Sequence, residues 1–172
     1  MESPKSQDML TPNTSAASVT NSATEGTYKP NDAWDGRCIS IPWPGGTYNI
    51  IERSSGRAMV INEHRYISLQ DIGDDPSPRH RWMCVEELGN FGFVNIQTGF
   101  YLCRDDKFGL GCWGNGVGES EYVIPRKKPD GGYELLFHYG PHYLRRVCVD
   151  EDGVSLMLRL HGITSFEFIK VC

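Results

Sequence analysis

The sequence has no long apolar run, no surplus of basic residues and no common motif for catalysis or metal binding. No stretch approaches the ~20 apolar residues that a membrane-spanning helix needs. The formal net charge is −5 at pH 7. Nucleic acids and anionic membranes are bound through surplus Lys and Arg, so an acidic balance disfavours both. We interpret the short basic clusters at 126–128 and 145–146 as solvated loop charge, and we expect neither a nucleic-acid nor a membrane partner.

Motifs with a defined chemistry are also absent. The sequence contains no HExxH, no GxSxG and no glycine-rich phosphate loop, and its six cysteines form no CxxC pair. It therefore implies no cofactor and no bound metal. The N-terminus lacks the charged and then apolar layout of a secretion signal. We expect a cytoplasmic protein with six free thiols; in an exported protein, the even number of cysteines would suit disulfides instead.

Turn residues, by contrast, are plentiful. The 19 Gly and 10 Pro recur through the whole chain, which favours many short elements over long helices. No segment shows the i, i+3, i+4, i+7 apolar spacing of a long helix. Hydrophobic residues make up 39% of the chain and aromatic residues 11%, which is enough for a sizeable core. These features predict an all-β protein.

The chain divides into three parts. Residues 1–30 have few large apolar side chains and cannot bury enough surface to offset their ordering entropy, so we expect a disordered tail. Residues 31–45 contain Trp34 and Trp43 together with two prolines in their last four positions. That segment predicts an extended lead-in without a regular strand, whose tryptophans plug the open end of a barrel. Residues 46–172 form the predicted folded domain.

The predicted domain contains three divergent copies of one unit, with a period of about 40 residues. Each copy has a strand that begins with an aromatic residue, a turn glycine, two further strands and a closing aromatic strand. The leading aromatic residues are Tyr48, Phe93 and Tyr133, the turn glycines are Gly56, Gly99 and Gly140, and the closing aromatic residues are Trp82, Tyr122 and Phe166. A propeller needs at least four such units. Three copies of four strands therefore predict a β-trefoil of twelve strands in three pseudo-repeats.

The second copy carries a family resemblance. The segment 93–103, followed by Gly109-Leu110 and Glu121-Tyr122-Val123, resembles one repeat of a fascin-type or fibroblast-growth-factor-type β-trefoil. The resemblance covers residues 46–172 and implies the fold alone, because trefoils serve as lectins, growth factors, actin-bundling units and protease inhibitors. The dense basic patch of a growth factor is missing. So is the Gln-x-Trp that a ricin-type lectin carries near the end of each copy, where only Trp82 occupies such a place.

Polar, aromatic and turn residues converge in two places. In the third copy, His138 and His142 flank one tight turn, with Tyr139, Tyr143 and Arg145 beside them. Either histidine could act as an acid or base if an acidic neighbour tuned it, or both could be surface residues of a hairpin. The second place is the end of the third strand of copy two. There Trp113, followed by Asn115, could stand exposed and stack on a sugar or another apolar ring.

Three functional hypotheses follow. The first is a monomeric, non-enzymatic binding module that recognises a carbohydrate or a protein through trefoil loops. Its ligand-binding candidates are Trp113, Asn115, Tyr139, Tyr143 and Arg145. The second is a protease-inhibitor or effector-type interaction protein that uses the exposed loop 73–81. The third is a small enzyme with acid/base or cyclase-like chemistry on an apolar small molecule, with His138, His142 and His161 as catalytic candidates.

Overall fold

A computed structural model describes residues 38–171. The predicted disordered tail and Trp34 lie outside these residues. Within them the chain forms thirteen strands and one short 3₁₀ helix, and it has no helix long and apolar enough to cross a membrane. The elements in chain order are β1 (Ile39–Ser40), β2 (Thr47–Glu52), β3 (Ala58–Ile61), β4 (Ile67–Gln70), η1 (Pro78–His80), β5 (Arg81–Glu87), β6 (Asn90–Asn95), β7 (Tyr101–Arg104), β8 (Leu110–Gly114), β9 (Val123–Lys127), β10 (Tyr133–His138), β11 (Leu144–Val149), β12 (Leu156–Arg159) and β13 (Phe166–Lys170).

Six of the strands close into a barrel. The antiparallel order is β13-β10-β9-β6-β5-β2, and β13 also pairs with β2, which completes the ring. Pairings such as Tyr48 with Trp82 and Tyr133 with Phe166 place the leading aromatic residue of one strand opposite the closing aromatic residue of its neighbour. Closure leaves these six strands without a free edge.

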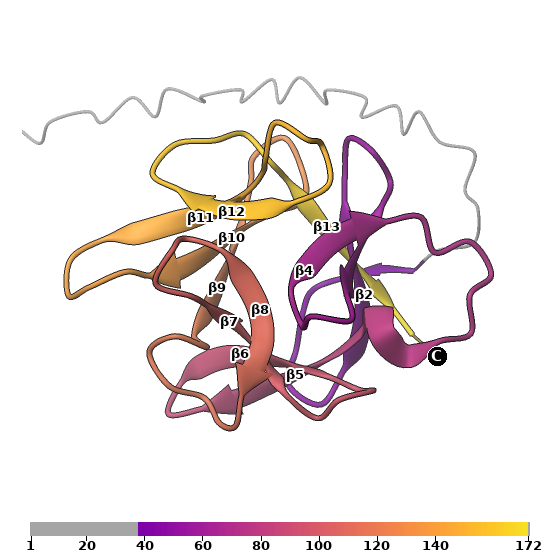
Figure 1. Ribbon diagram of the computed structural model, residues 1–172, viewed down its shortest axis with the longest axis horizontal. Coiled ribbons are helices and arrows are strands. Elements are labelled where there is room, and N and C mark those ends of the chain that lie inside the picture. The colour runs from indigo at the N-terminus through magenta and orange to yellow at the C-terminus, as the bar shows by residue number, and fades with distance from the viewer. Residues whose placement is uncertain (1–37, 172) are drawn as a thin grey trace, which may run out of the picture. The chain divides into compact units, whose positions relative to one another are not determined.

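The other strands of the repeats form three hairpins, β3–β4, β7–β8 and β11–β12, one for each repeat. Figure 1 shows β4, β8 and β12 arranged around the centre of the barrel. Isolated bridges join each hairpin to the next, and they pair Tyr66 with Gly111, Gly109 with Met157, and Ser68 with Ser155. With β2–β5, β6–β9 and β10–β13 as its three repeats, this arrangement confirms the predicted β-trefoil of twelve strands.

Backbone hydrogen bonds repeat the threefold pattern where the hairpins meet. The turn of each hairpin offers a carbonyl oxygen to an N–H group on the second strand of a neighbouring hairpin. The three bonds run from Cys112 N to Arg65 O (2.8 Å), from Leu158 N to Phe108 O (2.7 Å) and from Leu69 N to Val154 O (2.8 Å). The ring of bonds fixes the three hairpin turns around one axis, so side chains from all three repeats face a common space.

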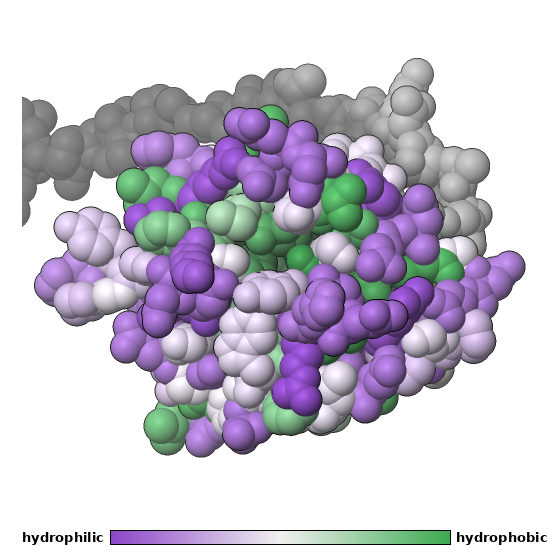
Figure 2. Space-filling model, viewed as in Figure 1, coloured by the Kyte–Doolittle hydropathy of each residue, from purple (hydrophilic) through white to green (hydrophobic). Residues whose placement is uncertain are grey.

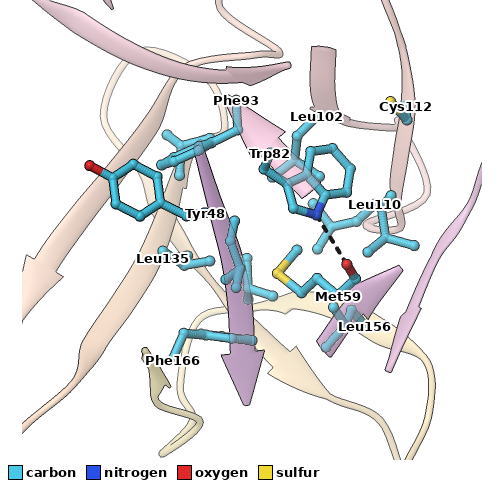
Figure 3. Close-up of a cluster of buried hydrophobic side chains, with 14 of the residues drawn as sticks. Tyr48, Met59, Trp82, Phe93, Leu102, Leu110, Cys112, Leu135, Leu156 and Phe166 are labelled. Atoms are coloured by element: carbon cyan, nitrogen blue, oxygen red, sulfur yellow. Dashed lines mark hydrogen bonds between the residues drawn. The ribbon is translucent and has the colours of Figure 1, made fainter. Parts of the chain in front are cut away.

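The core lies inside the barrel, and its packing explains the repeated aromatic positions. The rings of Tyr48, Phe93 and Tyr133, which lie in the first strands of the three repeats (β2, β6 and β10), all contact Phe168, with centroids 5.8, 5.5 and 5.4 Å apart. Trp82 is fully buried, and its indole Nε1–H donates a 3.0 Å hydrogen bond to the carbonyl oxygen of Met59 (Figure 3). The aromatic residues found by repeat alignment therefore have a packing role.

The lead-in differs from its prediction in two respects. Residues Ile39 and Ser40 form a short strand, β1, paired with β13. Trp43 does not plug the barrel, because 68% of its surface is exposed. The extended backbone alternates its side chains, so Pro42 is buried while Ile41 and Trp43 point outward. The expectation that Trp43 would close the barrel is therefore wrong.

Candidate binding site

The three hairpins enclose a hollow on the pseudo-threefold axis, which we call the axial hollow. Its volume is about 290 Å³. Ile67, Leu110 and Leu156, the first residues of β4, β8 and β12, form its apolar floor. Figure 2 shows this hollow near the centre of the view, with hydrophobic residues inside it and mostly hydrophilic residues around it. Because the floor residues occupy equivalent positions, the hollow follows directly from the threefold repeat.

The rim of the axial hollow is polar, and two of its residues also shape the hairpin turns. The Asn62 side-chain oxygen accepts hydrogen bonds from the N–H groups of His64 and Tyr66, at 2.9 and 3.0 Å. Asp105 Oδ1 likewise accepts from the N–H groups of Lys107 and Gly109, at 2.8 and 2.7 Å. Within residues 38–171, the amide nitrogen of Asn62 and the second carboxylate oxygen of Asp105 have no hydrogen-bond partner and can meet a ligand.

Tyr66 supplies the aromatic surface of the hollow and is 48% exposed. Its ring meets the indole of Trp113 edge to face, with centroids 5.4 Å apart and planes at 79°. The Trp113 indole lies over Gly111, where an added Cβ would come within 1.7 Å of it. The predicted ligand residue Trp113 is thus half-buried and supports Tyr66. The Trp113 side chain does not line the hollow.

A second group of side chains, which we call the arginine–tyrosine cluster, consists of Arg104, Phe108, Tyr139 and Arg145. The guanidinium carbons of Arg104 and Arg145 lie 4.8 and 4.9 Å from the centroid of Tyr139. Arg145 also lies over Phe108 at 4.3 Å. Arg104 Nε donates a 2.7 Å hydrogen bond to the carbonyl oxygen of His138. The structure therefore brings together two predicted ligand residues, Tyr139 and Arg145, beside a hairpin of the second repeat.

The turn between β10 and β11 departs from its counterparts. In the first two repeats the side chains of Glu52 and Asn95 accept hydrogen bonds from the backbone of this turn. The equivalent residue in the third repeat is His138, and the strand pairing there comprises three residue pairs where the other two repeats have one. The turn extends away from the barrel (Figure 1), and it exposes His142 and 63% of Tyr143.

The three candidate catalytic histidines occupy different environments. His138 is half-buried at the end of β10, His142 is exposed in the following turn, and His161 is exposed in the loop between β12 and β13. None of them lines the axial hollow. In the part of the chain that the structure describes, no three His, Cys, Asp or Glu side chains are grouped to hold a metal. Asn115, another candidate ligand residue, is exposed just beyond β8.

The loop 73–81, the candidate for insertion into a partner, is held at its C-terminal end. Asp75 accepts a 2.8 Å hydrogen bond from Ser77 N–H and lies 3.4 Å from Arg79. The carbonyl oxygen of Arg79 accepts a 2.9 Å bond from the Asn95 side chain, and His80 is buried. Gly73, Asp74 and Pro76 stay exposed.

No protein-family model matches the sequence, and no curated protein matches it. Solved structures do match. A GlcNAcα1-4Gal-releasing endo-β-galactosidase from Clostridium perfringens superposes with a TM-score of 0.64 at 18% identity, over 74% of this chain and 33% of that one. The ricin B-like lectin of Macrolepiota procera, in complex with lactose, gives 0.59 at 12% identity, over 76% and 98%. SeviL, bound to the asialo-GM1 saccharide, gives 0.55 at 15% identity, over 73% and 96%.

The chain therefore spans about a third of the endo-β-galactosidase and nearly all of the other two proteins. The match to a ricin B-like lectin is one of structure, because the sequence contains no Gln-x-Trp and Trp82 is preceded by Arg79-His80-Arg81. At identities of 18% or lower, the likeness is one of fold, and the fold is the β-trefoil.

Proposed function

We propose that the protein is a non-enzymatic carbohydrate-binding module and that its site is the axial hollow. The observation that carries the proposal is the half-exposed ring of Tyr66, supported by Trp113 at the edge of a hollow with an apolar floor and a polar rim. A sugar ring has C–H groups that pack on an aromatic face and hydroxyl groups that need hydrogen-bond partners. A concave, partly apolar site with a few placed polar groups suits such a ligand.

The size and the rim of the axial hollow favour a small sugar. Its volume of about 290 Å³ lies at the lower end of the range for ligand pockets, roughly 300–1,000 Å³. The amide nitrogen of Asn62, the free oxygen of Asp105 and the ammonium of Lys107 supply both donors and acceptors. We therefore expect a terminal mono- or disaccharide as the recognised unit. The lactose and asialo-GM1 saccharide in the two structural neighbours make these sugars the first probes.

The test is titration calorimetry with lactose and the asialo-GM1 saccharide. If neither binds, a glycan array selects the sugars for the next titrations. Tyr66→Ala is expected to weaken binding about 10-fold, because it removes the stacking surface. Trp43→Ala is the matched control, since Trp43 is an exposed aromatic residue outside the axial hollow. A glycan that binds wild type and Tyr66→Ala equally well would place the site elsewhere.

A second pair of variants separates a binding module from an enzyme. In a binding module, Trp113→Ala is expected to weaken glycan binding by releasing Tyr66, and His138→Ala to have little effect. In an enzyme the order is reversed. Loss of His138, His142 or His161 would then remove a proton-transfer step worth roughly 10²–10⁴ in rate, with binding largely kept. Turnover of a small apolar substrate that depends on one of these histidines would contradict the proposed function.

A further inference from the structure

The turn that joins β7 to β8 separates two polar surfaces. Asp105, Lys107 and Gly109 line the axial hollow. The alternate residues of this turn face the arginine–tyrosine cluster. The Asp106 carbonyl oxygen accepts a 3.3 Å hydrogen bond from the Tyr139 hydroxyl, and Phe108 lies under Arg145. The cluster is therefore the immediate neighbour of the axial hollow, on the other side of one hairpin turn.

The arginine–tyrosine cluster holds two positive charges, and among residues 38–171 a single ion pair, with Glu119, opposes them. Both guanidinium groups lie over the same Tyr139 ring, so they are within about 10 Å of each other, which is one Debye length at 0.1 M salt. Arg104 reaches Glu119 at 3.8 Å, and the Glu119 side chain is 63% exposed. Arg145 forms no ion pair with any residue between 38 and 171. Its Nε–H is buried and has no hydrogen-bond partner in the same range.

The equivalent junctions between the other repeats need only one arginine. Arg65, in the turn of the first hairpin, lies over Phe100 at 4.5 Å. Arg57 donates a 2.6 Å hydrogen bond to the carbonyl oxygen of Gly153 in the turn of the third hairpin. Packing between repeats is thus achieved with a single guanidinium group at these two places. The two arginines at Tyr139, Arg104 and Arg145, are therefore more than the packing of this junction requires. Arg145 has guanidinium donors without a partner among residues 38–171, and they lie beside the axial hollow.

We propose that the arginine–tyrosine cluster is an anion subsite that takes one sulfate ester or carboxylate of a glycan bound in the axial hollow. The planar guanidinium fork binds such groups through two parallel hydrogen bonds. The terminal amino groups of Arg145 are the donors that can meet such a group, because its Nε–H is buried. Asp106 and Glu119 border the cluster, and the chain is acidic as a whole, so the subsite suits a single anionic group and not a polyanion. The anion site stands on the cluster alone, whereas its glycan context rests on the proposed function.

The first test follows the arginine Nε–H signals by NMR during titration with sodium sulfate or sodium acetate at constant ionic strength. We expect a saturable shift of the Arg145 signal, with Arg65 unchanged as the matched arginine over a phenylalanine ring. The larger response of the two salts identifies the preferred anionic group. Arg145→Lys and Arg104→Lys keep the charge but lose the fork. In Arg104→Lys the Arg145 signal should therefore no longer saturate, and in Arg145→Lys the Arg104 signal should not saturate either. A linear response, or an equal response of Arg65, would overturn the proposal.

The second test compares neutral lactose with lactose that carries a sulfate ester and with one that carries a carboxylate. We expect about 10-fold tighter binding of an acidic form by wild type, loss of that difference in Arg145→Lys and its retention in Arg65→Lys. Tyr66→Ala should weaken all forms alike. If lactose binds but the acidic forms gain nothing, the subsite is wrong and the proposed function stands. If sulfate shifts Arg145 but no glycan binds, the subsite stands and the proposed function is wrong.

Discussion

Tyr66 and Trp113 meet edge to face although they belong to different repeats, one before β4 and the other in β8. Their contact depends on Gly111, which pairs with Tyr66 across the hairpin junction and leaves room for the indole two residues further along the same strand. Side chains at positions i and i+2 of a strand share one face, so any side chain at position 111 would compete with Trp113. The aromatic wall of the axial hollow is thus set by a glycine.

Gly111→Ala should therefore displace Trp113 without removing it. An added Cβ would lie 1.7 Å from the indole, so the ring must move and lose its contact with Tyr66. We expect a changed tryptophan fluorescence spectrum and a loss of glycan affinity close to that of Trp113→Ala. Gly116→Ala is the matched control, because no atom lies within 4 Å of its added Cβ. Unchanged fluorescence in Gly111→Ala would contradict the described position of the indole.

Trp82→Phe should destabilise the fold without touching the site. The change removes the buried N–H donor of the 3.0 Å hydrogen bond to Met59 and leaves unfilled volume in the core. We expect the free energy of unfolding to fall by about 1–3 kcal/mol, measured by urea denaturation. Trp43→Phe, at an exposed position, should change the same free energy by less than about 0.5 kcal/mol. Equal losses in the two variants would contradict a core role for Trp82.

The fold could be predicted from the sequence because the core residues of the three repeats leave a recognisable pattern of aromatic residues. Tyr48, Phe93 and Tyr133 recur at intervals of about 40 residues, and all three reach the same barrel interior, where they contact Phe168. The lead-in escaped prediction because it belongs to no repeat. With no internal copy to compare, nothing in the sequence indicated that Pro42 would face inward in place of Trp43.

The candidate site was harder to predict, because it forms between repeats. Tyr66 and Lys107 are more than 40 residues apart in sequence and meet only when the hairpins pack around one axis. Repeat alignment locates strands but does not say which side chains face that axis. For Trp113 a usable signal was present: a glycine two residues earlier in a strand provides the space on which an indole can lie. Tyr139 with Arg145 was proposed from proximity in sequence, and the cluster adds Arg104 and Phe108 from the neighbouring repeat.

Native thiol reactivity should separate one described cysteine from the others. Cys38 is exposed, whereas Cys84, Cys103, Cys112 and Cys148 are buried free thiols. Burial raises the pKa of Cys84 to about 12 and that of Cys103 to about 11, so almost no thiolate exists there at pH 8. With iodoacetamide at pH 8 we expect Cys84 and Cys103 to react at least about 100-fold more slowly than Cys38. Peptide mass spectrometry measures each rate.

The same reagent tests the predicted redox state. After denaturation without reductant, all six cysteines of the chain should be labelled. Cys172 lies outside the described residues, so its state stays a prediction from the sequence. Fewer than six labels would show a disulfide and would favour export. Fast native labelling of Cys84 would instead contradict the packing of β5 in the barrel.

Acid should weaken the fold through His80 before it does so through the carboxylates. His80 is 3% exposed, and its Nδ1 has no hydrogen-bond partner within residues 38–171. Burial lowers the pKa of His80 below its usual 6.5, and the positive charges of Arg81 and Arg79 act in the same direction against the opposing effect of Asp75. The unfolded chain therefore binds this proton more readily than the native state. Stability from neutral His80 is fully present above pH 6.5 and is lost as the pH falls towards the folded pKa.

Urea denaturation between pH 7.5 and 4.5 measures this loss, and Tm shifts give a second reading. For one proton, the free energy of unfolding can fall by at most about 1.4 kcal/mol per pH unit. Hydrogen bonds to Glu52 and Glu134 outweigh the effect of burial and lower the pKa of both carboxyl groups below 4.5. The stability that these carboxylates contribute is therefore lost mainly below pH 4.5, and the loss between pH 7.5 and 4.5 reports on histidine. His80→Gln should flatten the slope, because glutamine cannot take up the proton. The matched control is His64→Gln, at an exposed histidine in the turn between β3 and β4, which should keep it. If His80→Gln retains the full slope, the acid-sensitive group is a different histidine.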